Sequence, residues 1–290
     1  MSANRAIDLK KTAIDWLGIT PFLLFAVMFL IAPTLYLVTG AFLNPAGEFT
    51  FENIGGLFTD KILASYWISI KISLASPIGG ALIGFWLAWA VVLGGLPSWI
   101  RSSLLTFSGV ASNFAGVPLA FAFLATLGRT GLVTMILRDW FGINLYATGF
   151  NLLSFVGLTL TYMYFQIPLM VLIITPALDG LKKEWREAAE ILGATNRQYW
   201  TKVALPILFP SILGTTLLLF ANAFGAIATA YSLTGSTFNI VPIQLYAQIR
   251  GDVLHNPNLG YALALGMIVI TGISNLIYIW LRMRAERWQK

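Results

Sequence analysis

Six long runs of apolar residues occupy most of this 290-residue sequence and limit how it can fold. A helix needs about 20 apolar residues to cross roughly 30 Å of hydrocarbon. Runs of that length lie at 19–42, 64–92, 104–127, 152–178, 205–229 and 260–281. A backbone in lipid must satisfy its own hydrogen bonds, and these runs lack the alternation of a β-barrel. The sequence therefore predicts an all-α, polytopic membrane protein with six transmembrane helices.

The composition supports lipid as the solvent of this chain. Hydrophobic residues make up 58% of it and charged residues 10%, whereas a soluble domain carries about a quarter charged residues. The chain has no cysteine, which excludes a disulfide framework and a thiolate metal site. A net charge of +6 could suggest nucleic acid as the partner of a soluble protein. In a membrane protein the basic residues are expected in cytoplasmic loops, and nucleic acid is not expected as a partner.

Basic residues concentrate in alternate segments between the apolar runs. One set of segments contains Arg5, Lys10, Lys11, Arg101, Lys182, Lys183, Arg186, Arg197, Lys202, Arg282, Arg284, Arg287 and Lys290. The other set contains Lys61, Arg129, Arg138 and Arg250. Because basic loops stay in the cytoplasm, both termini are expected inside. The first run exceeds the apolar core of a signal peptide, which predicts a retained helix. We therefore expect a cytoplasmic segment at 1–18, a transmembrane domain at 19–281 and a cytoplasmic tail at 282–290.

The loop at 179–204 has the pattern of two short helices joined by a turn. Trp185, Ala188, Ala189 and Leu192 recur at helical spacing among charged residues, which predicts an amphipathic helix. Gly193 with Ala194 is expected to end it, and Asn196 is expected to cap a second helix at 197–203. Pro206 suits the first turn of the next membrane helix, where its missing N–H costs nothing.

Such a helical turn beneath a membrane offers a rigid projection for another protein. Ala188 and Ala189 would allow a partner surface to approach closely. Gly193 would permit the tight turn, and Glu187 offers a charge to a basic group or a helix N-terminus. Because the next membrane helix follows the projection directly, a displacement of the projection would tilt that helix.

The residues of this loop resemble the EAA loop of ABC importer permeases. The pattern is Glu187-Ala188-Ala189, three residues, Gly193, nine residues, then Val203-x-Leu205-Pro206. The family more often has Ile where this chain has Val203. The loop also precedes the penultimate membrane helix, as it does in the family.

The resemblance implies the transmembrane domain of a type I ABC importer in a bacterial inner membrane. Glu187, Ala188, Ala189, Gly193, Leu205 and Pro206 would form the loop that couples to the ATPase. The family implies two cytoplasmic ATPase subunits that bind ATP and Mg²⁺, a second permease subunit, the same or homologous, and an extracytoplasmic solute-binding protein. In layout the chain is most similar to permeases for polyamines, ferric iron, thiamine and aminophosphonates.

The energy source distinguishes this interpretation from a secondary, ion-coupled transporter. The chain has no G-x-x-x-x-G-K-[ST] motif, so we expect it to bind no nucleotide and to have no catalytic site. All twelve Asp and Glu fall outside the predicted spans, and the single histidine, His255, falls in an outside loop. This weighs against proton coupling but leaves open a sodium site made of backbone carbonyls. No metal site is expected, and a receptor or scaffold remains a further alternative.

Polar residues within the spans are candidates for the path of the solute, because they are costly in lipid. The candidates are Ser112, Asn113, Tyr162, Gln166, Thr215, Asn222, Thr271 and Asn275. Within the last three pairs, spacings of four or seven residues predict a shared helix face. Hydrogen bonding between helices is the alternative role. Lys71 is the ionisable residue expected within a span, and it either snorkels to the outer interface or contacts an anionic solute group.

Overall fold

The computed structural model describes residues 9–235, 237–250 and 256–286 of the chain. This part is helical, apart from loops, turns and an isolated bridge between Leu43 and Phe49. Six of its helical stretches are long and apolar enough to cross a membrane, and they lie at Gly18–Gly40, Asp60–Leu93, Val117–Phe141, Phe155–Asp179, Asn196–Phe224 and Pro257–Arg284. The all-α class and the number of predicted spans are confirmed.

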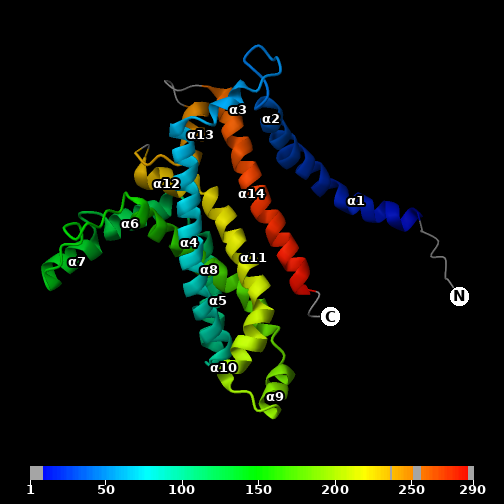
Figure 1. Cartoon of the computed structure of the whole chain (residues 1–290), viewed down its shortest axis with the longest axis vertical. Helices are drawn as coiled ribbons and strands as arrows, with labels where there is room; N and C mark the ends of the chain where they lie inside the picture. Colours follow the sequence, from blue (N-terminus) through cyan, green and yellow to red (C-terminus); the bar gives the residue numbers. More distant parts are fainter. Residues whose placement is uncertain (1–8, 236, 251–255, 287–290) are drawn as a thin grey trace.

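Four long helices form the body of the molecule (Figure 1). They are α4 (Asp60–Leu93), α8 (Phe155–Asp179), α11 (Leu205–Phe224) and α14 (Pro257–Glu286). Helix α4 packs against both α8 and α11, and α14 packs against α11. Close contact between α4 and α8 requires Gly84, since a Cβ there would lie 2.6 Å from the carbonyl oxygen of Ile167. Small residues that bring helix backbones together are the usual packing device within membranes.

The third predicted span, 104–127, is wrong as a single continuous helix. Helix α5 (Ser98–Asn113) packs against α8, and then the chain breaks at 114–116 before α6 (Val117–Leu127) begins. Gly116 has φ +73°, and Pro118 lies in the first turn of α6. A proline can begin a helix but cannot lie inside one without losing a hydrogen bond, so the helix restarts here. Helix α6 continues through a turn into α7 (Leu132–Phe141), which projects from the body (Figure 1).

The first span lies apart from the body (Figure 1). It comprises α1 (Leu9–Ala26), a π-helical turn η1 (Val27–Ile31) and α2 (Ala32–Gly40). None of its most apolar window is buried inside the chain. Helix α2 contacts α14, and the ring centroids of Tyr36 and Tyr261 lie 5.7 Å apart there.

The short helices lie at opposite ends of the body. Helices α3 (Glu52–Gly56) and α13 (Val241–Arg250) lie at one end, and α9 (Lys183–Ile191) and α10 (Asn196–Tyr199) lie at the other (Figure 1). Ser69 in α4 holds α13 in place, because its Oγ accepts a 2.9 Å hydrogen bond from the backbone N–H of Val241. Helix α12 (Ile227–Thr234) follows α11 after a break at 225–226 and packs against α6.

Candidate functional site: the elbow below α8 and α11

The segment 179–204, called the elbow from here on, turns the chain from α8 back into α11. Helix α9 ends at Ile191, with Leu192 as its C-cap, directly before the predicted terminating residue Gly193. Gly193 follows with φ +76°, and nothing lies within 4 Å of a Cβ placed on it. The N–H of Gly193 donates to Glu190 O, and the N–H of Ala194 donates to Ala189 O, both at 2.9 Å. These two bonds form a Schellman motif, so the backbone conformation is what requires glycine.

The second half of the elbow is continuous with α11. Thr195, and not the predicted Asn196, caps α10: the N–H of Gln198 donates to Thr195 Oγ1, and the N–H of Thr195 donates to Gln198 Oε1 at 2.7 Å. This reciprocal pair is a capping box. A π-helical turn η2 (Trp200–Ala204) then leads directly into α11. The helical stretch is continuous from Asn196 to Phe224, so the prediction that Pro206 lies at a helix start, where its missing N–H costs nothing, is wrong. No loop separates the elbow from the membrane helix.

A small apolar cluster holds the two halves of the elbow together. Ala189 of α9 is buried and packs in one cluster with Tyr199 and Ala204. The predicted apolar face of α9 is therefore only partly correct, since Ala188 and Leu192 are exposed and Trp185 is half-buried. Buried small side chains explain how two short helices keep one fixed angle without a large core.

The exposed tip of the elbow is apolar, a feature that the sequence analysis missed. Ile191 and Leu192 are each 86% exposed. Glu187 and Ala188 are also exposed, on the preceding turn of α9. The signal was present in the sequence, because two aliphatic residues stand directly before Gly193, the residue expected to form the turn. These two adjacent aliphatic side chains form a small apolar surface at the tip of the projection.

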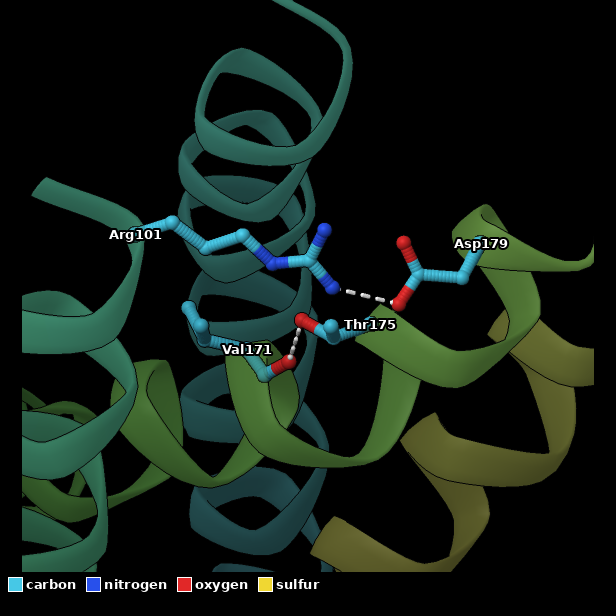
Figure 2. A network of polar contacts seen from close by, with 4 residues as sticks. All are labelled: Arg101, Val171, Thr175 and Asp179. Carbon is cyan, nitrogen blue, oxygen red and sulfur yellow. Dashed lines mark hydrogen bonds and ion pairs between the residues drawn. The ribbon is translucent and has the colours of Figure 1, made fainter. Parts of the chain in front are cut away.

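An ion pair fixes the start of the elbow against α5. Arg101 Nη2 lies 2.6 Å from Asp179 Oδ2, the last residue of α8 (Figure 2). One turn earlier, Thr175 Oγ1 donates to the carbonyl oxygen of Val171 at 2.7 Å (Figure 2). The two charged side chains are 38% and 41% exposed. The pair therefore contributes roughly 0–1 kcal/mol and mainly orients the end of α8.

Three of the polar residues proposed for the path are buried between helices. Tyr162 in α8 donates a hydrogen bond to the carbonyl oxygen of Ala226, at the break between α11 and α12. Gln166 Nε2 donates to Ser76 Oγ of α4 at 3.3 Å, and its Oε1 is buried without a partner. Thr215 is buried while Asn222, seven residues later on the same helix, is exposed.

The two exposed candidates lie beside the helix breaks. Asn113 is the last residue of α5, and Asn222 lies three residues before Gly225, where α11 ends. The breaks themselves are joined, because the N–H of Gly116 donates to Thr229 Oγ1 of α12 at 2.7 Å. The structure thus places two interrupted helices against each other. Interrupted helices in membrane proteins are tolerated where they are buried in protein or line a cavity.

The remaining candidates have intermediate burial. Ser112 and Thr271 each donate a hydrogen bond to the backbone of their own helix, to Gly109 O and Met267 O respectively. Asn275 is half-buried one turn beyond Thr271. Their contacts with the backbone of the same helix are those expected of polar side chains within a membrane.

Lys71 lies on an exposed face of α4. Its Nζ is 4.9 Å from the ring centroid of Trp67, one turn nearer the α3 end of the molecule. Eleven residues separate Lys71 from the start of α4, which places it about 16 Å along the helix. A side chain that reaches back toward the nearer end and lies over an indole fits the snorkelling role.

Metal binding has no candidate in the part of the chain that the structure describes. Within residues 9–235, 237–250 and 256–286, no group of three or more His, Cys, Asp or Glu side chains could hold an ion. His255 lies outside these residues.

The sequence matches one protein family over most of its length. Residues 80–288 match the family described as the binding-protein-dependent transport system inner membrane component. The chain belongs to this family. It is a permease subunit of an ABC importer, and the elbow and both helix breaks lie within the matched residues. Nothing in the comparisons favours the alternative of a secondary transporter.

Two curated relatives align with this permease over nearly their whole length. It is 28% identical over 236 residues to the molybdenum transport system permease protein of Escherichia coli (strain K12), covering 80% of this chain and 98% of the relative. It is 24% identical over 298 residues to the sulfoquinovosyl glycerol transport system permease protein of Agrobacterium fabrum, covering 96% of this chain and 92% of the relative.

Solved structures share the fold of the permease. A chain of a bacterial ABC transporter that imports the acidic polysaccharide alginate matches with a TM-score of 0.68 at 18% identity, and 98% of each chain is covered. A second structure of an alginate transporter, in complex with a periplasmic protein bound to alginate pentasaccharide, matches with a TM-score of 0.69 at 17% identity. At such identities the likeness concerns the fold.

Proposed function

We propose that the elbow is the docking site of a separate cytoplasmic ATPase subunit and passes its motion to α11. The observation that carries this proposal is the combination of an exposed apolar tip with a base that continues as helix. Ile191 and Leu192 are each 86% exposed, and η2 leads into α11 without a loop. A partner that covers the tip gains apolar burial, and any movement of the tip reaches α11 directly.

Helix α11 acts as the lever in this proposal. It has 20 residues and is therefore about 30 Å long. One end is the elbow, and the other end lies at the break with α12, close to Asn222. Tilting α11 would change the junction of α12 with α6, where the Gly116 N–H meets Thr229 Oγ1. The proposed solute path runs beside these breaks, with Asn113 and Asn222 as exposed amides along it.

We propose that the permease works in an assembly with other subunits. Two ATPase subunits hold the ATP and Mg²⁺, and this chain holds neither. A second permease subunit, the same or homologous, completes the path and covers part of the first span, which packs little within its own chain. An extracytoplasmic binding protein delivers the solute, as the complex of the alginate transporter with its periplasmic protein supports by analogy. The elbow end is cytoplasmic, and both termini lie on that side.

The proposal is tested by transport in proteoliposomes that contain the permease with its ATPase and binding protein. Uptake should require ATP hydrolysis and should persist when ionophores collapse proton and sodium gradients. Asn222→Ala should lower uptake severalfold without lowering recovery of the complex, because the amide is exposed and has no contact that the fold needs. Asn275→Ala changes another candidate amide, half-buried and away from both breaks, and its loss of uptake should be smaller if the path runs beside the breaks. Uptake that follows an ion gradient without ATP would contradict the proposal.

A further inference from the structure

A cavity of about 250 Å³ lies where the elbow meets the end of α4. Two elements form its walls. Trp89 and Leu93 come from the last turns of α4, and the elbow supplies the rest: Leu181, Lys182, Lys183, Arg186, Asn196, Tyr199 and Trp200. This cavity is not used by the proposed docking at the tip, because Ile191 and Leu192 are not among its lining residues.

The charge of the cavity has one sign. Lys182, Lys183 and Arg186 line it, and none of the nine lining residues is acidic. All three basic side chains are exposed. Arg186 pairs with Glu190 at 3.1 Å on the surface of α9, but that pair is more than half exposed and holds Arg186 only weakly. Lys182 Nζ also lies 5.8 Å from the ring centroid of Trp185. These three cations on the elbow wall provide donors that match an oxyanion.

The floor of the cavity is aromatic and lies at the end of the long apolar helix α4. The rings of Trp89 and Trp200 meet edge to face at 5.8 Å, and Tyr199 meets Trp200 at 5.9 Å. Trp89 and Leu93 close the last turns of α4, where a membrane helix of 34 residues leaves the bilayer. Tryptophan and tyrosine favour this depth because they have an apolar body and a polar edge. The cavity is therefore cationic toward the elbow and apolar toward α4.

We propose that this cavity binds a phosphate-bearing anion, held by Lys182, Lys183 and Arg186 above the indoles of Trp89 and Trp200. Basic pockets beside membrane helices on the cytoplasmic face suit anionic headgroups. That this pocket faces the cytoplasm rests on the proposed function, in which the elbow end of the molecule is cytoplasmic. Because its walls come from both α4 and the elbow, a bound anion joins the two and restrains the angle of the elbow. Occupancy is thereby a means to regulate coupling.

The test measures retention of a defined anion by the full chain. The permease is placed in nanodiscs of phosphatidylcholine with or without phosphatidylglycerol, and retained lipid is counted by native mass spectrometry. The K183Q/R186Q variant removes two of the three cavity cations. The R197Q/K202Q variant removes the same charge from exposed positions of the elbow that do not line the cavity. Glycerol phosphate and inorganic phosphate are added to separate samples as competitors without an acyl chain.

The expected result is that wild type and R197Q/K202Q retain phosphatidylglycerol, while K183Q/R186Q retains about tenfold less or none. Displacement by glycerol phosphate or inorganic phosphate at low concentration would support the same cavity and assign a soluble source of phosphate. Equal retention by all three proteins, or none by wild type, would overturn the inference. Retention is measured without an ATPase, so its failure is separate from failure of docking at the tip. Far-ultraviolet circular dichroism of each variant confirms that the helices are intact.

Discussion

Replacing Gly193 by valine is expected to lower ATP-dependent uptake on the order of tenfold while the permease still reaches the membrane. Gly193 has φ +76°, and nothing lies within 4 Å of its would-be Cβ. The cost of valine is therefore backbone strain of about 1–2 kcal/mol, which shifts the local equilibrium about 5- to 30-fold toward other turns. The elbow would lose its fixed angle to α11, while the membrane core would be untouched. Uptake into vesicles, normalised to permease content, measures the effect.

Two further variants test whether the effect depends on where the backbone strain lies and on how large it is. Gly142 has φ +66°, follows helix α7, and has nothing within 4 Å of a Cβ. Gly142→Val therefore imposes a similar strain away from the elbow and should leave ATP coupling intact. Gly193→Asn should retain most uptake, because asparagine tolerates the left-handed region. If Gly193→Val transports as well as wild type, the turn geometry is not part of coupling.

The double substitution Ile191→Ser and Leu192→Ser is expected to abolish stable binding of the ATPase subunit. Each side chain is 86% exposed in the permease, so its removal should not affect the fold. Full burial of an aliphatic side chain contributes about 1.5–3 kcal/mol, and losing two would weaken binding on the order of 10²- to 10⁴-fold. Co-purification of the ATPase with the tagged permease, and ATP hydrolysis stimulated by the binding protein, measure the loss.

The control for this double variant is Leu96→Ser. Leu96 is also exposed, at 43%, in the connection between α4 and α5 at the elbow end of the molecule. Leu96→Ser removes an aliphatic side chain from the elbow end of the molecule without changing Ile191 or Leu192. Full recovery of the ATPase with the Ile191/Leu192 variant would show that the apolar tip does not dock it.

The features that the sequence predicted depend on local pattern. Six apolar runs define the spans because lipid imposes one length on every crossing helix. The turn of the elbow is predictable because Gly193 acts on the backbone within a few residues, where it permits the left-handed conformation. The +6 charge and its clustering likewise need no tertiary information.

The features that the sequence did not predict depend on contacts between distant segments. The break at 114–116 is stabilised by the hydrogen bond from Gly116 to Thr229, 113 residues away. Gln166 is buried because Gly80 and Ser76 of α4 pack against it, so its polarity did not imply contact with solute. The apolar side chain of Leu192 suggested burial, but its position after the last turn of α9 leaves it in solvent. Helical spacing alone predicts Leu192 within α9, on its apolar face, whereas it lies just after the helix ends.

Cross-linking from the tip of the elbow tests the central claim most directly. The chain has no cysteine, so Leu192→Cys introduces a single thiol. In native membranes a short reagent that links a thiol to an amine should join this residue to the ATPase subunit, and ATP should change the yield. Ala147→Cys, exposed in the connection that precedes α8 at the other end of that helix, should give no such product. A thiol at 192 that reacts only from the exterior, or never cross-links to the ATPase, would contradict the account.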